Sequence, residues 1–327
     1  MLRGKFFPPK QITTSFEGKI VIVTGSNTGV GYAAALKYVE LRASTVILGV
    51  RSMEKGETAK AKMEKATGRK GVVEVWELDM ASSKSIDAFA HRADTLSKVD
   101  AVVLNAGVVP KTFRQSEEGW EMNIQVNTLG TALLAILLIP KLRASGTTDS
   151  PSHLTVVSST GHLDIRMKLE DKSRLLYKYN TDLGVGSYQQ HVMSKLFMMW
   201  VTRELASRCV DANGLSIVII NDCCPGACRS DVTREFSGPV TSIAKTVVGY
   251  ALWRPAENGA RVLVGATTLG NVSHGRFWSA NGSFETGPGP YITSDEGKAL
   301  QRDVWSQITE VLKEKNSRVK GILSDLS

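Results

Sequence analysis

Two ionisable side chains near the middle of the chain, His191 and Lys195, lie four residues apart. An imidazole ordinarily titrates at about 6.5, and an adjacent ammonium pushes that pKa lower because like charges repel. At neutral pH the ring is then mostly uncharged, so it is a competent base or hydrogen-bond donor but a poor proton donor. The pair predicts a site that handles protons.

A glycine-rich turn upstream predicts a dinucleotide-binding site. The apolar run from Lys19 to Val23 is typical of a strand, and a helix-forming segment begins at Tyr32. Glycines between them let the backbone take positive φ and leave no Cβ in the way of a pyrophosphate at the positive end of the helix. The alternative is a tight turn that binds nothing. The residues assigned to the nucleotide here are Gly25, Ser26, Asn27, Thr28, Gly29, Val30 and Gly31.

The second predicted strand, residues 45–50, ends without the Asp or Glu that would bind a ribose 2′-hydroxyl. Arg51 follows directly, and a guanidinium at this place suits a 2′-phosphate. Asn27, in the glycine-rich turn, could help to hold the same phosphate. The expected cofactor is therefore NADP(H), and the alternative interpretation of Arg51 is a solvated loop cation.

Two further strand ends indicate the same ligand. A third strand is expected over residues 72–79, with Asp79 placed to bind adenine, and a fourth over residues 101–104. In an open parallel sheet the ligand crevice lies outside these carboxyl ends. The alternatives to nucleotide binding are that Asp79 lies near a helix N-cap and that Asn105 only forms a turn. The nucleotide contacts assigned to these ends are Asp79, Met80, Asn105, Ala106 and Gly107.

The glycine-rich turn, the Asn-Ala-Gly motif, a Ser-Ser strand end and a helix with Lys195 together resemble the short-chain dehydrogenase/reductase family from Gly18 to Arg234. Residues 51–56 and 224–230 resemble its retinol-dehydrogenase-like branch, which is common in filamentous fungi. The resemblance implies an α/β fold, a single doubly wound parallel sheet (Rossmann fold), and an NADP(H)-dependent oxidoreductase of fungal secondary metabolism. It also assigns nucleotide contacts to Lys195, Pro225, Gly226 and Ser230.

The catalytic positions of that family can be matched one by one. Asn127 matches the residue that anchors a water relay, Ser159 the one that hydrogen-bonds the reacting carbonyl, and Lys195 the one that holds the nicotinamide ribose. The family's tyrosine is missing, because His191 occupies the position four residues before Lys195. Tyr188, about one helical turn earlier, is the nearest phenol.

Three functions stay open for this arrangement. In the first, hydride transfer continues, with His191 acting through water, Ser159 alone supplying the hydrogen bond, or Tyr188 as the acid. In the second, NADP(H) is structural or recycled, and His191 is the base for an isomerisation, epimerisation, elimination or cyclisation. In the third, the protein is a degenerate nucleotide-binding member. His191 itself could also be an ordinary core or surface histidine.

Two long connections are expected to select the substrate. Residues 163–187 are unusually many for a connection and predict a lid, and residues 228–250 could fold over the nicotinamide end. Their Leu, Met and aromatic side chains favour a small hydrophobic substrate. By resemblance, a polyketide or terpenoid carbonyl compound is the expected class.

Composition fits one domain, over residues 18–327, after an extended arm at 1–17. The 327-residue chain is 42% hydrophobic, and its net charge of +8 is scattered along the sequence. Scattered positive charge is typical of solvated faces and of attraction for phosphorylated cofactors, and no motif for nucleic acid accompanies it. The most apolar stretch, residues 132–139, is shorter than the ~20 residues of a membrane span.

Four cysteines lack the paired spacing of a zinc site, and no secretory leader is evident. A reduced, cytoplasmic protein without a metal is therefore expected. Helices are also expected at residues 257–265 and 296–313. The family often pairs through long helices, here residues 119–143 and 187–208, so a homodimer stays open.

Overall fold

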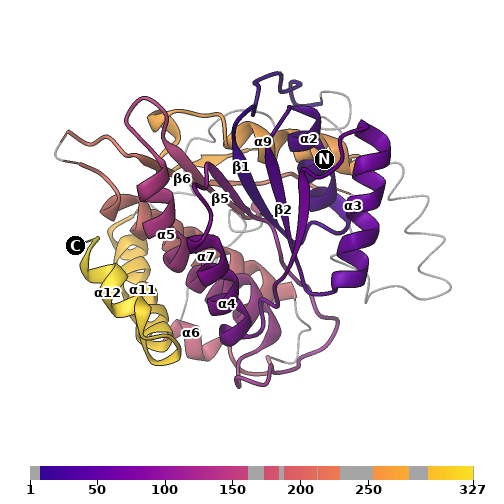
Figure 1. Cartoon of the computed structure of the whole chain (residues 1–327). Coiled ribbons are helices and arrows are strands. Elements are labelled where there is room, and N and C mark those ends of the chain that lie inside the picture. Colours follow the sequence, from indigo (N-terminus) through magenta and orange to yellow (C-terminus); the bar gives the residue numbers. More distant parts are fainter. Residues whose placement is uncertain are drawn as a thin grey trace.

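The computed structural model describes residues 8–160, 173–183, 188–211, 213–228, 253–279 and 294–326. Within these residues seven strands form one sheet in the order β3-β2-β1-β4-β5-β6-β7, and every neighbouring pair is parallel. Helices cover both faces of this sheet (Figure 1). The predicted doubly wound Rossmann fold is therefore confirmed.

The strands are short and mostly apolar because helices cover both faces of the sheet. Their bounds are β1 Ile20–Thr24, β2 Thr45–Val50, β3 Val73–Glu77, β4 Ala101–Leu104, β5 Ser152–Val157, β6 Val218–Cys223 and β7 Phe277–Trp278. The third strand ends two residues before its predicted end at Asp79. Strand β7 has only two residues, too few for a sequence pattern, and it is defined by its pairing with β6.

The helices follow the predicted alternation with the strands. They are α2 Gly29–Glu40, α3 Met53–Thr67, α4 Ser83–Asp94, the π-helix η1 Ile124–Gly130, α5 Thr131–Ser145, α6 Leu175–Lys178, α7 Tyr188–Arg208, α9 Ala256–Ala266, the 3₁₀ turn η4 Asn271–Ser273, α11 Asp295–Lys315 and α12 Arg318–Ser324. The helices expected near 257–265 and 296–313 are present and slightly longer. Helix α12 was not predicted, because its charged sequence resembles a tail.

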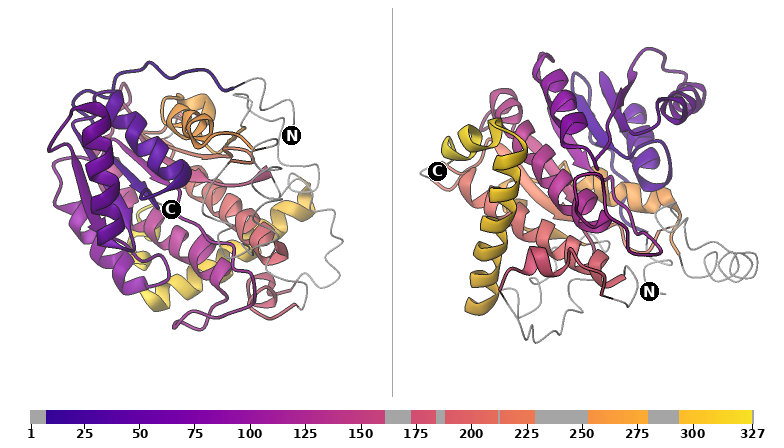
Figure 2. Two further views of the ribbon diagram at one scale, coloured as in Figure 1. Left: turned by 90° about the vertical axis from the view of Figure 1, so that its right-hand side faces the viewer. Right: turned by 90° about the horizontal axis from the view of Figure 1, so that it is seen from below.

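Two hydrophobic cores lie on opposite faces of the sheet, and strand residues enter them alternately. Ile22 and Ile47 belong to the core under α4, α5 and α7, whereas Val23 and Leu48 belong to the core under α2, α3 and α9. Figure 2 shows the two layers of helices from the side and from below. The two cores fix the register of the sheet and bring its carboxyl ends to one edge.

Helices η1 and α5 are continuous, so the apolar segment is longer than its sequence suggested. Residues Ile124–Ser145 are long and apolar enough to cross a membrane by length and composition, but 89% of the apolar window is buried inside the protein. Pro140 interrupts the backbone hydrogen bonding near the end of α5, where its side chain is exposed. The segment is the central helix of the core, as its apolar character predicted.

The C-terminal helices cover the two long helices that could pair in a dimer. Helix α11 packs on α7, and α12 packs on α5 (Figure 1). Val304 and Ile308 of α11 are fully buried there. A homodimer through α5 and α7 would therefore require α11 and α12 to move aside.

Part of the N-terminal arm lies against α2 and α9. The Arg261 guanidinium of α9 donates to the carbonyl oxygen of Pro9 at 3.2 Å. Phe16 is 3% exposed and meets the ring of Tyr38 edge-on, with centroids 4.8 Å apart. The arm thus closes the outer side of one core.

We expect Ile308→Ala to lower the free energy of unfolding by about 3 kcal/mol, because the substitution leaves a cavity between α11 and α7. Urea unfolding measures the change. The control Ser306→Ala, at an exposed position of the same helix, should change it by less than about 0.5 kcal/mol. Equal effects of the two would show that α11 is not part of the core.

Candidate active site and nucleotide site

The glycine-rich turn is held close to the loop that follows β4. Gly25 has a φ of 64°, and a Cβ there would lie 2.9 Å from the Cα of Ala106. A Cβ on Gly31 would lie 2.4 Å from the Nδ2 atom of Asn105. Both positions therefore require glycine, and the second is explained by packing within the protein as well as by access for a pyrophosphate.

Asn105 joins the ends of β1 and β4. Its Nδ2 donates to the carbonyl oxygens of Thr24, at 2.9 Å, and of Gly25, at 3.3 Å. The Thr24 hydroxyl accepts in return from the backbone N–H groups of Asn105 and Ala106, both at 3.0 Å. The Asn105 side chain thus shapes the nucleotide turn from behind, which is a structural role that the turn-former alternative had partly anticipated.

The beginning of α2 suits an anion. The first helical N–H groups have no partner within the helix, and no acidic side chain lies in the first turn. Among the described residues, neither the exposed Arg51 guanidinium nor the Asn27 amide has a hydrogen-bond or ion-pair partner. A phosphorylated dinucleotide therefore fits the donors available at the ends of β1 and β2.

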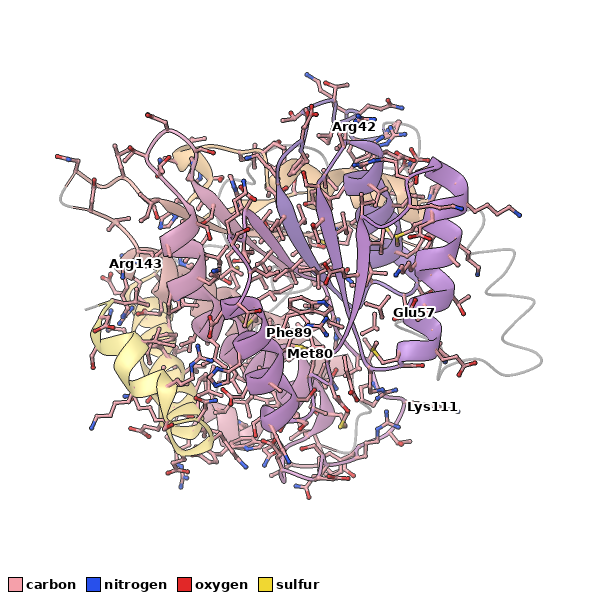
Figure 3. The ribbon with its side chains drawn as sticks, in the orientation of Figure 1. Arg42, Glu57, Met80, Phe89, Lys111 and Arg143 are labelled. Atoms are coloured by element: carbon pink, nitrogen blue, oxygen red, sulfur yellow. The ribbon has the colours of Figure 1, made fainter. Side chains whose placement is uncertain are left out.

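Asp79 and Met80 lie beyond the end of β3. Asp79 Oδ1 accepts from the backbone N–H of Ala81 at 2.9 Å, so one carboxylate oxygen stabilises the local turn. Met80 is 5% exposed and lies in the core with Phe89 (Figure 3). Its side chain therefore serves packing, and only its backbone and the second Asp79 oxygen are suited to face a nucleotide.

Gly107 is the point where the loop beside the glycine-rich turn meets the predicted catalytic residues. A Cβ at Gly107 would lie 3.1 Å from Asn127 Oδ1 and 3.6 Å from Lys195 Nζ. Asn127 comes from η1 and Lys195 from α7, two elements that pack on each other. The structure therefore brings three residues together that are 20 to 88 positions apart in the sequence.

The Asn127 side chain is clasped by the backbone of Val108. Asn127 Oδ1 accepts from the Val108 N–H at 2.8 Å, and Asn127 Nδ2 donates to the Val108 carbonyl at 3.0 Å. The same Nδ2 lies 3.1 Å from Ser194 Oγ and 3.5 Å from His191 Nδ1. With 1% exposure, Asn127 is a fixed polar centre next to the histidine ring.

His191 is set up to stay neutral. Burial lowers the pKa of its imidazole to about 4, with the Lys195 ammonium adding to the shift, while a hydrogen bond with the Val108 backbone opposes it. A neutral imidazole has a single N–H, and a bond to the Val108 carbonyl uses it. The other ring nitrogen is then a lone-pair acceptor, which is the form of a base.

Lys195 is 8% exposed and donates from Nζ to the carbonyl of Val157 at 2.8 Å. Burial lowers the pKa of this ammonium to about 8, and the neighbouring acidic side chains of Cys224, Asp222 and Cys223 oppose that shift. Burial also raises the pKa of Asp222, which is 1% exposed and accepts from the Thr202 hydroxyl at 3.1 Å. Lys195 thus places a positive charge at the end of β5.

For the remaining predicted site residues, the structure gives the position in the fold and few side-chain contacts. Ser159 is half-buried, two residues beyond the end of β5. A Cβ at Gly259 of α9 would lie 3.1 Å from both Pro225 and Val30, so the loop after β6, which continues into Gly226, lies beside the glycine-rich turn. Tyr188 begins α7, but its side chain lies outside the described residues, as does Ser230.

The predicted covers are described only in part. Within residues 163–187, the segment 173–183 is packed into the protein, because Leu175 and Leu176 are fully buried and Gln307 accepts from the Leu176 N–H at 3.1 Å. This segment is an anchor that packs against α11, and the substrate cover expected over residues 163–187 stays a prediction. Residues 163–172 and 184–187, and residues 229–250, lie outside the described part of the chain.

Sequence reasoning missed two polar residues that precede Asn127. Glu121 and Asn123 are both fully buried at the start of η1 and hydrogen-bond to each other. An acidic residue just before an apolar helix is a known start signal that could have identified Glu121. Among the described residues, no group of three or more His, Cys, Asp or Glu side chains could hold a metal ion.

The pKa of His191 predicts a pH dependence. The folded ring takes a proton only near pH 4, whereas the unfolded chain takes one near 6.5, so its contribution to stability is present above pH 6.5 and is lost as the pH falls toward 4. His191→Gln should remove on the order of 2 kcal/mol of that loss. Urea unfolding across this pH range measures it. Replacing the exposed His91 by Gln is the control, and equal pH slopes for wild type and His191→Gln would contradict the prediction.

Known proteins resemble this chain over its length and in its fold. The short chain dehydrogenase family model matches residues 19–164. Two fungal relatives are the short-chain dehydrogenase/reductases ffsI of Aspergillus flavipes, 43% identical over 98% of this chain and 93% of its own, and phmF of Phaeosphaeria nodorum, 41% identical over 97% and 93%.

Solved structures agree in fold. A protein of uncharacterised activity from Mycobacterium paratuberculosis has a TM-score of 0.66 at 26% identity and covers 93% of this chain and 98% of its own. A short chain dehydrogenase from Shigella flexneri, complexed with NADP, has a TM-score of 0.57 at 20% identity and covers 83% and 99%. This chain belongs to the short-chain dehydrogenase/reductase family.

Proposed function

We propose that the protein is an NADP(H)-dependent oxidoreductase that acts on a hydrophobic carbonyl compound or alcohol. The observation that carries the proposal is the Arg51 guanidinium at the end of β2, which has no partner among the described residues and follows the strand next to β1, whose turn leads into α2. No carboxylate stands at that strand end to prefer a free 2′-hydroxyl. The family membership supports a nicotinamide cofactor.

The nucleotide would be held by the glycine-rich turn, by Asn27 and Arg51 at a 2′-phosphate, and by Lys195 at the nicotinamide ribose. When bound, this cofactor supplies or accepts a hydride at its nicotinamide ring. The chain's own contribution is to place a substrate next to Ser159 and His191. Ser159 follows the end of β5, and His191 lies close to the Asn127 side chain, so both are at the carboxyl edge of the sheet.

His191 would act as a base on the bound substrate. The ring nitrogen that does not carry the proton can take the hydroxyl proton of an alcohol, because burial, with the Lys195 ammonium adding to it, keeps the ring uncharged beforehand. Because the ring has no acidic proton to give at neutral pH, carbonyl reduction would need water or Ser159 as the hydrogen-bond donor. The site therefore favours alcohol oxidation over carbonyl reduction.

The same neutral ring favours one second candidate. A base beside a bound nucleotide could also remove a proton from carbon, in an isomerisation, epimerisation, elimination or cyclisation without net redox change. The specific observation for this function is the uncharged His191 ring, which has a free lone pair at neutral pH, although a pKa of about 4 makes it a weak base.

The setting of the reaction is part of the proposal. The fungal origin of the relatives supports a role in fungal secondary metabolism, with a polyketide or terpenoid substrate. Four cysteines without disulfide bonds are consistent with a cytoplasmic location.

We expect NADPH to bind at least about tenfold more tightly than NADH, and Arg51→Glu to abolish or reverse this preference, because a carboxylate repels the 2′-phosphate and accepts from a ribose hydroxyl. Fluorescence titration of the reduced nucleotides measures both affinities. Lys62→Glu, an exposed position of α3, makes the same charge change and should keep the preference. Equal affinity of the wild type for both nucleotides would refute the role of Arg51.

Isotope labelling separates the two chemistries. Candidate hydrophobic ketones are incubated with NADPH deuterated at C4, and the matching alcohols with NADP⁺. We expect label in the reduced product, faster turnover from the alcohol side, and a loss of about 10²-fold or more in His191→Ala. His191→Tyr should raise carbonyl reduction, since a phenol restores a proton donor. Conversion without label and without net cofactor change would assign the isomerase class.

A further inference from the structure

A buried carboxylate stands at the start of the helix that carries Asn127. Glu121 is fully buried, and its Oε2 accepts from the backbone N–H groups of Asn123, at 2.8 Å, and of Ile124, at 3.1 Å. Its Oε1 accepts from Asn123 Nδ2 at 3.0 Å. Both oxygens act as acceptors, as in an ionised carboxylate, although burial raises the pKa of this acid and Arg114 opposes that shift.

The amide of Asn123 lies between the Glu121 carboxylate and the Asn127 amide, so its orientation decides which of its atoms faces Asn127. Because Asn123 Nδ2 is bound to the carboxylate, its Oδ1 must point the other way, and Asn127 Nδ2 lies 3.4 Å from that oxygen. The N–H end of the Asn127 amide, which also donates to the Val108 carbonyl at 3.0 Å, therefore faces Asn123 and lies 3.5 Å from His191 Nδ1. A chain of three side chains connects a buried charge to the histidine ring.

The wide turn of η1 makes this chain of contacts possible. Segments of π-helix are uncommon and often occur at functional sites. The turn begins where Glu121 binds the first N–H groups and ends at Gly130, whose missing Cβ would lie 2.2 Å from the Met80 carbonyl. The carboxylate therefore holds the irregular turn that carries Asn127.

We propose that Glu121 is a positioning residue of the active site: through Asn123 it reinforces the orientation that the Val108 backbone gives the Asn127 amide, and that amide in turn acts on the His191 ring. The inference rests on the proposed function, in which His191 is the base. Glu121 itself does not touch the histidine in the structure.

The isosteric variant Glu121→Gln tests the order of hydrogen-bond donors and acceptors that runs from Glu121 through Asn123 to Asn127. The oxygen of Gln must stay with the two backbone N–H groups, so its NH₂ would face Asn123 Nδ2. Asn123 would then flip and present its NH₂ to Asn127, which places donor against donor. We expect the titration midpoint of the His191 ring to shift by at least about half a pH unit, and turnover to fall about tenfold, with NADPH affinity unchanged.

Two further variants separate positioning from folding. Asn123→Ala leaves the Glu121 bonds to the backbone intact but interrupts the path to Asn127, so it should shift the His191 midpoint with a smaller loss of stability. The double variant Glu121→Gln with Asn123→Asp restores an acceptor facing both neighbours and should return the midpoint to the wild-type value. Glu118→Gln, which removes a carboxylate outside the chain of contacts, is the matched control.

The readout is ¹⁵N and ¹H NMR of the His191 ring in the nucleotide-free protein, with urea unfolding as the check on folding. An unchanged ring titration in both Glu121→Gln and Asn123→Ala, or no recovery in the double variant, overturns the proposal. Since the NMR experiment needs no nucleotide, it tests the role of Glu121 even if the wild type binds no NADPH. A failure to bind NADPH would refute the proposed function instead.

Discussion

Burial of the Lys195 ammonium is the constraint on which the rest of the site depends. A charged group taken out of water must be hydrogen-bonded, and the Val157 carbonyl provides that bond at 2.8 Å. The charge in turn disfavours protonation of His191, which burial already disfavours. Burial of the ring and the cation at the end of β5 thus act together to keep His191 uncharged.

The sheet explains how a nucleotide turn and a catalytic cluster come to share one edge. Parallel strands bring their carboxyl ends together, and β1, β4 and β5 are neighbours. Asn105 ties the turn after β1 to the end of β4, and Gly107 lies two residues further, in contact distance of Asn127 and Lys195. One loop, residues 105–108, therefore contacts both the glycine-rich turn and the Asn127 side chain.

The buried polar groups around this edge form a connected hydrogen-bond network. Glu121, Asn123, Asn127 and Ser194 are at most 1% exposed, and each has hydrogen-bond partners. In a low-dielectric interior an unpaired member would be costly, so the network holds each amide in one orientation. The uncharged His191 ring thus lies beside a rigid polar surface, and its single N–H is directed inward.

The sequence by itself determined the fold class and the order of the elements, because short apolar runs, glycine-rich turns and helix-forming segments are local patterns. It also determined which residue types stand at the strand ends, including Arg51 and His191. It missed β7 and α12, because a two-residue strand and a charged terminal helix are defined only by what they pack against.

Tertiary structure decided how those residues are used. Only the folded chain gives Asn105 and Met80 their structural tasks, makes residues 173–183 an anchor, and buries Lys195 and His191 deeply enough to lower both pKa values. It also connects Glu121 to His191. These properties depend on burial and on the distance between atoms far apart in the chain, which no local pattern encodes.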